Sequence, residues 1–264
     1  MDSLFLDQQQ YTEQSIGDYE SVWGEGFVSP GGIDKARELI ASLGLMPGAS
    51  LLDVGCGLGG SAFLMAQEFG FQVDAIDLSQ NMLAQAQLRC REKGLEGRVS
   101  LRLGDCLELD VENRYDAVYS RDAFLHIAQK TRLFEVLHRS LRPGGRLLFT
   151  DYCCAAKPWT DAFQEYVASR GYHLHTLDDY VALVRTAGFV EASGDDLTQE
   201  FISTLETDLV RISALENQDA LSQAWRAKLE RARAGEQRWG LLSARKAPLP
   251  RKLADPGKPG PEAS

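Results

Sequence analysis

Apolar and polar positions follow two periods along the chain, and the two alternate in a regular order. Short apolar runs predict buried strands, whereas longer stretches with apolar residues three and four positions apart predict helices. The predicted strands are one that starts at Leu51, then 71–76, 99–103, 115–119 and 146–150, and the predicted helices are 34–43, 61–69, 80–93 and 130–141. This alternation predicts an α/β fold in which right-handed crossovers build a doubly wound parallel sheet.

The pattern changes beyond residue 152, where helices predominate. The predicted helices are 158–169, 177–187, 197–215 and 220–234, and the predicted strands are 189–192 and 237–243. We expect a single domain over residues 1–247, in which 153–234 is a mainly helical region. Residues 248–264 are rich in Pro, Lys and Gly, which predicts a disordered tail.

Aromatic residues and glycines mark the N-terminal segment, residues 1–32. Two interpretations fit it equally well. It can form a helical lid over a pocket, with a hinge-like turn at 29–32, or it can be an ordinary amphipathic helix.

The stretch from Leu51 to Gly60 reads as a buried strand that runs into a glycine-rich turn and opens the next helix. Glycine accepts positive φ and lets a ligand lie against the main chain. The free N–H groups at the start of the helix favour a negatively charged group. We therefore expect a ligand at this turn, although a tight turn without any ligand is the plainer alternative.

Gly55, Gly57 and Gly60 also satisfy G-x-G-x-x-G, the pattern of dinucleotide-binding dehydrogenases. Asp53, two positions before the first glycine, favours a different ligand. A carboxylate there would repel a pyrophosphate and attract the ammonium of S-adenosylmethionine. S-adenosylmethionine is therefore preferred over NAD.

Further acidic residues follow the later strands, and in an open parallel sheet the carboxyl ends of the strands meet at one edge. We expect Asp77, Asp105 and the turn at 121–126 to converge there with Asp53. Asp77 can accept hydrogen bonds from both ribose hydroxyls, or it can cap the following helix beside Ser79. Asp105 can accept from an adenine amino group, or it can be a solvated turn residue.

Composition limits the possible partners. The 264 residues carry a formal net charge of −10, which argues against broad binding to nucleic acid or to anionic membranes. An anionic substrate would need positive charge concentrated locally.

The five cysteines have no C-x-x-C spacing, so a disulfide framework is not expected. No signal sequence and no membrane-spanning run is visible, so we expect a soluble, cytoplasmic and monomeric protein.

The glycine stretch, A-I-D at 75–77, G-D-C at 104–106 and L-R-P-G-G-R-L-L-F-T-D at 141–151 together resemble the class I S-adenosylmethionine-dependent methyltransferases. More narrowly, the chain resembles the phosphoethanolamine N-methyltransferases. This closer likeness rests on Q-Y-T at 10–12, Y-E at 19–20, F-V-S-P-G-G at 27–32, Y-S-R-D-A-F-L-H at 119–126, T-D-Y-C at 150–153, E-Y-V at 165–167 with Arg170 and Tyr172, and Q-R-W-G at 237–240. It extends from residue 5 to residue 244, and several of its motifs lie outside the shared cofactor fold.

The resemblance implies a Rossmann-like methyltransferase domain, with a seven-stranded sheet and a helical lid over residues 1–32. It implies successive methyl transfer from S-adenosylmethionine to the nitrogen of phosphoethanolamine, toward phosphocholine, without a metal. The cofactor-binding positions it implies are Val28, Ser29, Asp53, Gly55, Gly57, Asp77, Leu78, Asp105, Cys106 and Arg121. The phosphate-binding positions it implies are Ser29, Tyr19, Tyr152, Arg170 and Tyr172.

The resemblance also implies a catalytic pair, Tyr11 and His126, with Asp122 beside it. An alkylammonium has a pKa near that of lysine, about 10.4, and reacts only after it has lost a proton. His126 would accept that proton, Tyr11 would orient the imidazole and Asp122 would stabilise its charged form. Without the resemblance, His126 reads as a solvated histidine near a helix start. Tyrosine faces would suit the methylated cation that results.

One departure from the family pattern affects the expected phosphate site and the expected substrate. The resemblance places a phosphate-binding lysine shortly after Q-R-W-G, where this chain has Ser243, and Leu241 replaces an aromatic residue. Arg245 or Lys246 could reach the phosphate instead. Another small amine, such as a phosphonate amine or an amino acid, is therefore an alternative substrate. A nicotinamide dehydrogenase and a nucleoside-binding module without catalysis are the alternatives from other classes.

Overall fold

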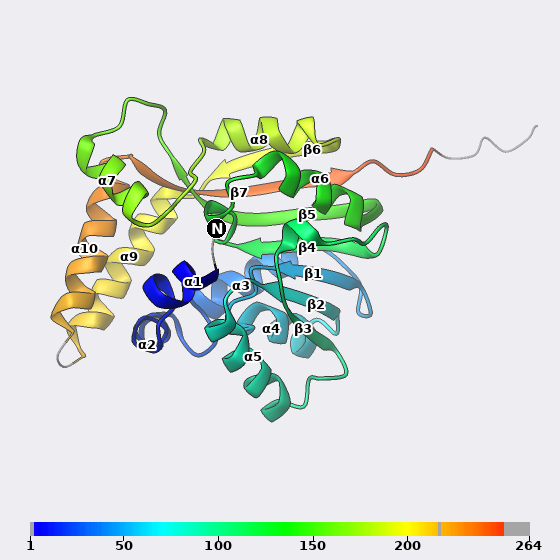
Figure 1. Ribbon diagram of the computed structural model, residues 1–264, viewed down its shortest axis with the longest axis horizontal. Coiled ribbons are helices and arrows are strands. Elements are labelled where there is room, and N and C mark those ends of the chain that lie inside the picture. The colour runs from blue at the N-terminus through cyan, green and yellow to red at the C-terminus, as the bar shows by residue number, and fades with distance from the viewer. Residues whose placement is uncertain (1–2, 216–217, 251–264) are drawn as a thin grey trace, which may run out of the picture.

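The computed structural model describes residues 3–215 and 218–250. Its centre is a seven-stranded sheet with the order β3-β2-β1-β4-β5-β7-β6 (Figure 1). The strands are β1 (Ser50–Val54), β2 (Gln72–Asp77), β3 (Val99–Leu103), β4 (Tyr115–Arg121), β5 (Leu141–Cys154), β6 (Phe189–Asp196) and β7 (Gln237–Lys246). Among these strands only β7 runs antiparallel to its neighbours. The expected mostly parallel sheet of seven strands is confirmed.

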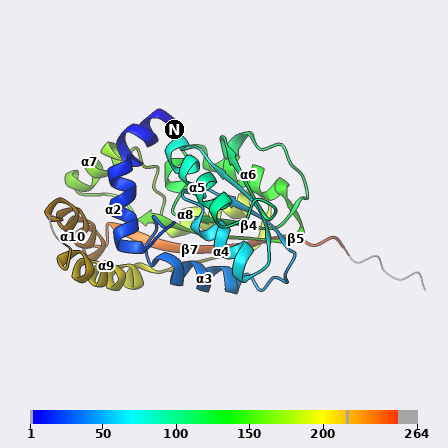
Figure 2. The same cartoon turned by 90° about the horizontal axis from the view of Figure 1, so that it is seen from below.

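Helices cover both faces of this sheet. The α-helices are α1 (Ser3–Phe5), α2 (Glu13–Trp23), α3 (Gly32–Ser42), α4 (Gly60–Glu68), α5 (Gln80–Glu92), α6 (Lys130–Ser140), α7 (Asp161–Ser169), α8 (Leu177–Thr186), α9 (Thr198–Ser213) and α10 (Asp219–Arg233), and the shorter turns of helix are η1 (Leu6–Gln10), η2 (Cys106–Glu108) and η3 (Phe124–His126). On β1, Leu51 packs with α3, α4 and α5, whereas Leu52 and Val54 pack with α6. Figure 2 shows α3 and α8 on opposite sides of the sheet. Apolar residues on both faces of β1 therefore require helices on both.

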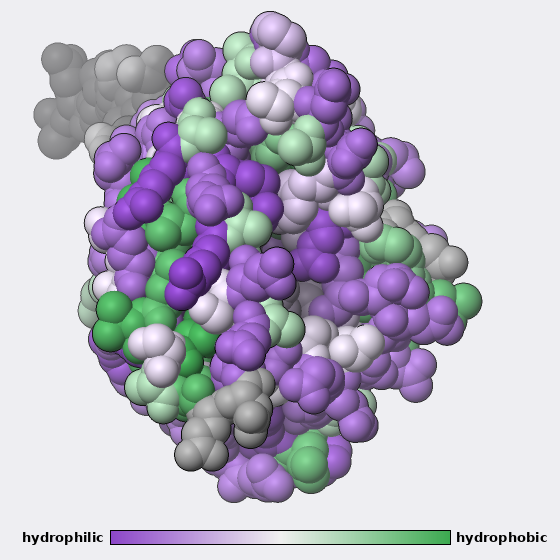
Figure 3. All heavy atoms as spheres, turned by 90° about the vertical axis from the view of Figure 1, so that its left-hand side faces the viewer, coloured by the Kyte–Doolittle hydropathy of each residue, from purple (hydrophilic) through white to green (hydrophobic). Residues whose placement is uncertain are grey.

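The mainly helical region after β5 is divided between two places. Helix α8 packs against β6 and belongs to the layer over the sheet, whereas α7, α9 and α10 lie together beyond one end of the sheet (Figure 1). Helix α2 joins this second group, because Trp23 Nε1 donates a 2.8 Å hydrogen bond to Asp208 on α9 and Trp225 on α10 donates to the same carboxylate. Polar side chains dominate the outer face at this end, with smaller apolar patches among them (Figure 3).

Some predicted boundaries are wrong. The helix predicted over 130–141 and the strand predicted over 146–150 meet without a loop between them, because β5 starts at Leu141 directly after α6. Leu141 pairs with Tyr115, and the register shifts before Arg146 pairs with Ala117. The strands predicted as 189–192 and 237–243 extend further, to Asp196 and Lys246. They are longer because backbone pairing extends a strand beyond its apolar core: β6 pairs with β7, and β7 also pairs with β5.

Two properties of the described residues bear on location and metals. No helix within 3–215 or 218–250 is long and apolar enough to span a membrane. The same residues contain no group of three or more His, Cys, Asp or Glu that could hold a metal ion.

The disordered tail was predicted for 248–264: residues 248–250 form neither helix nor strand, and 251–264 lie outside the described residues.

A close backbone approach holds the N-terminal segment against the glycine-rich turn. Gly60 N donates a 3.2 Å hydrogen bond to Gly26 O, and a Cβ on Gly60 would lie 2.4 Å from that oxygen. Because real Cβ atoms do not come so close to a carbonyl oxygen, glycine is required here for the contact.

We therefore expect Gly60→Ala to lower the free energy of unfolding by about 1–3 kcal/mol, the usual cost of overpacking. Gly97→Ala is the matched control, since a Cβ at Gly97 meets no atom within 4 Å. Urea unfolding of both variants measures the difference. Equal stability of the two would contradict the close approach.

Candidate functional site

A cavity opens at the carboxyl ends of β1, β2 and β4, where the sequence predicts that the acidic residues converge. The residues predicted from the sequence that line it are Tyr11, Val28, Ser29, Gly55, Gly57, Asp77, Leu78, Asp105, Cys106, Arg121, Asp122 and His126. Asp53 lines a smaller pocket that shares Val28, Ser29, Gly55, Gly57 and Arg121 with the cavity. Four predicted positions, Tyr19, Tyr152, Arg170 and Tyr172, are not among the lining residues of either and form a neighbouring cluster.

The glycine-rich turn brings the β4 loop onto this cavity. Gly55 has φ of 71°, and a Cβ there would lie 2.3 Å from the Cβ of Ala123. Gly55 N and Cys56 N both donate to Ile76 O, at 2.8 and 3.2 Å, which ties the turn to β2. The turn therefore fixes the loop that carries Asp122 and His126 beside the ends of β1 and β2.

Two acidic side chains of the cavity are held by backbone N–H groups. Asp77 accepts from Gly57 N at 2.7 Å and from Ser79 N at 2.8 Å, and burial raises its pKa. The helix cap of α5 is Ser79 and not Asp77, because the Ser79 side chain accepts from Met82 N. Asp105 accepts from Leu107 N at 2.8 Å. Both carboxylates are fixed at the cavity wall, where they suit hydroxyl or amino donors of a nucleoside.

Asp53 is a buried carboxylate with an unsatisfied oxygen. Its side chain is only 2 % exposed, and Oδ2 has no hydrogen-bond partner among residues 3–215 and 218–250. Burial, followed by the nearby charge of Asp77, raises the pKa of Asp53 to about 7, while Arg121 opposes the shift. An unpaired carboxylate of this kind suits a cationic group such as the ammonium of S-adenosylmethionine.

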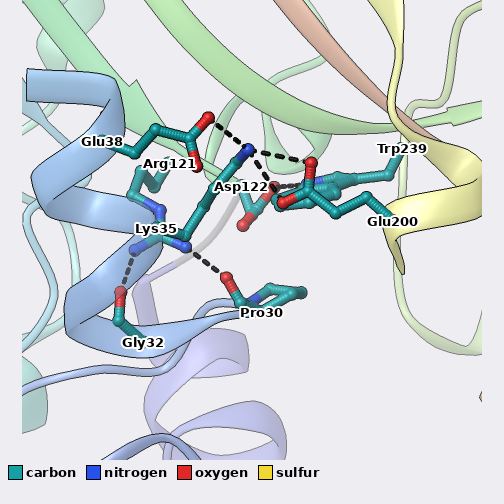
Figure 4. Close-up of polar contacts among 8 residues, drawn as sticks. All are labelled: Pro30, Gly32, Lys35, Glu38, Arg121, Asp122, Glu200 and Trp239. Carbon is teal, nitrogen blue, oxygen red and sulfur yellow. Dashed lines mark hydrogen bonds and ion pairs between the residues drawn. The ribbon is translucent and has the colours of Figure 1, made fainter. Parts of the chain in front are cut away.

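Arg121 holds the hinge-like turn at 29–32. Its guanidinium donates to Gly32 O at 2.9 Å and to Pro30 O, as Figure 4 shows. The same view contains Lys35, which is buried and forms ion pairs with Glu38 and Glu200 at 2.9 and 2.8 Å. Arg121 thus lines the cavity while its hydrogen bonds go to the backbone of the N-terminal segment.

Asp122 is half-buried and has a strained backbone. Its φ of 50° is unusual for a residue with a side chain, and Asp122 N donates to Thr150 O at 2.8 Å. Oδ1 accepts from Trp239 Nε1 at 2.7 Å (Figure 4), Oδ2 is unpaired within the described chain, and burial raises the pKa of the carboxyl. The expected contact with the His126 imidazole does not occur among these residues, because Trp239 on β7 holds the carboxylate instead.

The predicted pair of Tyr11 and His126 is present. Tyr11 Oη and His126 Nε2 are 3.1 Å apart, and the two rings meet edge-on. The His126 ring is 8 % exposed, so the alternative of a solvated histidine is wrong. Burial, with the positive charges of Arg170 and Lys130, lowers its pKa to about 3. The imidazole is therefore neutral at pH 7, and the lowered pKa makes it a weak base as long as the neighbouring positive charges are not offset.

A basic and aromatic cluster lies behind this pair. Arg170 Nη2 is 3.5 Å from Tyr19 Oη, and the Tyr172 ring meets the His126 ring edge-on with centroids 5.3 Å apart. Lys228 on α10 joins them, with Nζ 5.9 Å from the Tyr19 ring centroid and 6.0 Å from that of Tyr152. These contacts bring together all four predicted positions outside the cavity.

The two cations of this cluster are shielded from solvent to different degrees, since Lys228 is buried and Arg170 is half-buried. Neither Arg170 nor Lys228 forms an ion pair within the residues that the structure describes. Burial, with the charges of Arg170 and Arg231, lowers the pKa of Lys228 to about 7. Two unpaired cations beside tyrosine hydroxyls form a site for a small anion such as a phosphate.

The comparisons with known proteins agree with this geometry. A family model described as "Methyltransferase domain" matches residues 51–145. Phosphoethanolamine N-methyltransferase 1 of Arabidopsis thaliana is 39 % identical over 253 residues, which cover 92 % of this chain and 51 % of the plant protein. The phosphoethanolamine N-methyltransferase of Plasmodium falciparum is 30 % identical over 93 % of this chain and 96 % of its own length. The chain belongs to the phosphoethanolamine N-methyltransferase family.

A solved structure of the family has the same fold. Phosphoethanolamine N-methyltransferase 2 of Haemonchus contortus, in complex with phosphomonomethylethanolamine and S-adenosylhomocysteine, superposes with a TM-score of 0.88 at 33 % identity. The match covers 92 % of this chain and 59 % of that one. The chain spans about half the length of the plant relatives it matches.

Lys228 is a candidate site residue that the sequence reasoning missed. It lies on the buried face of α10 together with Leu221, Trp225, Leu229 and Ala232. A lysine at a position that helical periodicity assigns to the core was the available signal, because such a lysine needs a counter-charge or a ligand.

The residues after Q-R-W-G lie away from the site, so the expectation that Arg245 or Lys246 could reach the phosphate is wrong. The Ser243 hydroxyl is 2.9 Å from that of Ser193 on β6. Lys246 Nζ donates to Asn113 Oδ1 and Leu141 O, and Arg245 pairs with Glu191. A lysine in place of Ser243 would not enter the basic cluster, since that cluster takes its lysine from α10.

The unpaired carboxylate of Asp53 predicts a pH-dependent gain in stability for Asp53→Asn. Because the pKa of Asp53 is raised above its ordinary value, the wild type is penalised progressively as the pH rises from about 4 to about 7. At pH 8 we expect the variant to melt at least about 3 °C above the wild type, since 1 kcal/mol corresponds to about 2–4 °C for a chain of this size. The gain is expected to shrink at pH 5.

Thermal unfolding from pH 5 to pH 8 measures this gain, with Asp110→Asn as the control because the Asp110 side chain is 96 % exposed. Calorimetry with S-adenosylhomocysteine is expected to give a large loss of affinity for Asp53→Asn alone. A pH-independent difference between wild type and Asp53→Asn would contradict the charged-state penalty.

Proposed function

We propose that this chain is an S-adenosylmethionine-dependent N-methyltransferase that methylates phosphoethanolamine in successive rounds, toward phosphocholine. The observation that carries the proposal is a cluster that holds the half-buried Arg170 and the buried Lys228, neither of them in an ion pair within the described chain, next to the neutral imidazole of His126. The site thus offers an anion anchor next to a proton acceptor, which matches a short molecule with a phosphate at one end and an amine at the other. The complex of the Haemonchus contortus relative with phosphomonomethylethanolamine supports the same substrate class.

Three carboxylates support the cofactor. Asp53 suits the ammonium, Asp77 the ribose hydroxyls and Asp105 the adenine amino group of S-adenosylmethionine. When bound, S-adenosylmethionine supplies an electrophilic methyl group. The NAD alternative loses support because the chain belongs to a methyltransferase family and because the unpaired oxygen of Asp53 disfavours a pyrophosphate.

The substrate ammonium must lose a proton before its nitrogen can react. The neutral imidazole of His126 accepts it, and Tyr11 Oη orients Nε2. Asp122 acts on the substrate and not on the imidazole: its unpaired Oδ2 can accept an N–H of the ammonium. A phosphate on Arg170 offsets the positive charge that lowers the pKa of His126, so substrate binding itself makes the imidazole a stronger base.

Each methylation removes an N–H donor, and the final product is a permanent cation. Aromatic rings beside His126 can still attract it, at about 0.5–2 kcal/mol for each ring. Tyr11 and Tyr172 both contact the His126 ring. Arg170 and Lys228 would hold the phosphate in the same place in every round, which keeps successive acceptors in register.

The alternative of a different amine rested on Ser243. Because Ser243 lies four residues further along β7 than Trp239 and its hydroxyl contacts Ser193 on β6, this argument no longer favours a phosphonate amine or an amino acid. A nucleoside-binding module without catalysis would not require the buried pair of Tyr11 and His126.

An acceptor panel with labelled S-adenosylmethionine tests the proposal. We expect turnover of phosphoethanolamine and of its monomethyl form, and little turnover of ethanolamine, which lacks the phosphate. His126→Ala is expected to lose a factor of about 10²–10⁴ in kcat, the usual contribution of a positioned base. No turnover of phosphoethanolamine by the wild type would reject the substrate, and full activity of His126→Ala would reject the base.

Removal of the missed lysine tests the anchor separately. Lys228→Met is expected to raise KM for phosphoethanolamine at least about tenfold, because a charge-assisted hydrogen bond contributes about 1.5–3 kcal/mol. The affinity for S-adenosylhomocysteine should stay unchanged, since Lys228 does not line the cofactor cavity. An unchanged KM would remove Lys228 from the phosphate site.

A further inference from the structure

The proton acceptor and the anion anchor stand on two different loops. His126 ends the helical turn η3 after β4, whereas Arg170 and Tyr172 follow α7. The two loops meet through one backbone hydrogen bond, His173 N to Leu125 O at 2.7 Å. A single bond of this kind would not by itself fix the distance between the imidazole and the guanidinium.

A buried lysine ties the same two loops together. Lys130, the first residue of α6, is 3 % exposed, and its ammonium donates to Phe124 O at 2.7 Å, to Ile127 O at 2.5 Å and to His173 O at 3.1 Å. Two of these carbonyls flank His126 and the third follows Tyr172. All three N–H donors of the ammonium are therefore used to join the loop of the base to the loop of the anchor.

A carboxylate behind the loops supports this tie. Asp151 is fully buried, accepts from the Tyr180 hydroxyl and receives a backbone hydrogen bond from Leu125. Its charge opposes the lowering of the Lys130 pKa by burial. Asp151 thus helps to keep Lys130 in the cationic form, which binds carbonyl oxygens most strongly.

We propose that Lys130 is a positioning residue that sets the distance between the imidazole of His126 and the guanidinium of Arg170, and with it the preference for a two-carbon link between amine and phosphate. This inference rests on the proposed function. The physical reason is that an acceptor anchored at its phosphate presents its nitrogen at a distance fixed by its own chain length. Lys130 does not line the cavity, so it acts through the loops and not on the substrate.

Chain-length selectivity tests the proposal. The ratio of kcat/KM for phosphoethanolamine to that for 3-aminopropyl phosphate is measured for the wild type and for Lys130→Met, which keeps the length of the side chain and removes its donors. We expect the wild type to prefer phosphoethanolamine, and the ratio to fall at least about tenfold in the variant, because a misplacement near 1 Å changes rates by about 10²-fold. The affinity for S-adenosylhomocysteine is expected to stay within about twofold.

Lys246→Met is the matched control. Lys246 also donates to backbone carbonyls, Leu141 O at 2.8 Å and Arg139 O at 3.5 Å, but outside the site. It should lower stability without changing the ratio. If Lys130→Met does not fold, Lys130→Gln, which keeps one amide donor, takes its place with the same readout.

The outcomes separate the two proposals. Wild-type enzyme that methylates neither acceptor rejects the proposed function. Wild-type turnover of phosphoethanolamine with equal use of the longer acceptor, or a ratio unchanged in a folded Lys130 variant, rejects only the role of Lys130. A ratio that falls equally in Lys246→Met would mark the change as a general loss of stability.

Discussion

Charged side chains of opposite sign that form no ion pairs with one another within the described chain are the constraint on which this structure depends. Asp53, Asp77 and Asp105 line the cofactor side, while Arg170 and Lys228 lie behind His126. Each group would find a partner if the two sets could meet. The sheet edge, the glycine-rich turn and the neutral Tyr11–His126 pair keep them apart. Both sets are therefore left to ligands that carry the complementary charges.

The N-terminal segment reaches both sides of this arrangement. Asp7 accepts from Ser79 Oγ at 2.5 Å at the start of α5, next to the cofactor side. Gln10 Nε2 donates to Arg170 O at 2.6 Å, on the anchor side, and Tyr11 contacts His126. One short segment thus contacts both halves of the site, and its position depends on the hydrogen bonds that it forms with each half.

The site carries a cost in stability that the rest of the molecule offsets. Buried polar atoms without a partner in the described chain include Asp53 Oδ2, Asp122 Oδ2, His126 Nδ1 and Arg170 Nε. Each such atom costs about 1–3 kcal/mol. Two large apolar cores, one on each face of the sheet, stabilise the framework against this cost. Three of these atoms, on Asp53, Asp122 and His126, belong to residues that line the cavity or the smaller pocket beside it, where a ligand can satisfy them.

The sequence determined the fold class, the order of the elements and most cofactor-side residues, because strand periodicity, glycine turns and strand-end acids are local signals. Asp53, Asp77 and Asp105 follow from the rule that parallel strands end at one edge. The positions Tyr11, His126 and Arg170 came from a family resemblance, since their spacing carries no local pattern. Only the tertiary structure placed Lys228 beside Tyr19 and Tyr152, and Ser243 beside Ser193. It alone also paired Asp122 with Trp239 and joined Lys130 to both loops. These contacts connect residues 6 to 209 positions apart through packing of α10, β7 and the two loops, and no sequence period encodes which charge faces which neighbour.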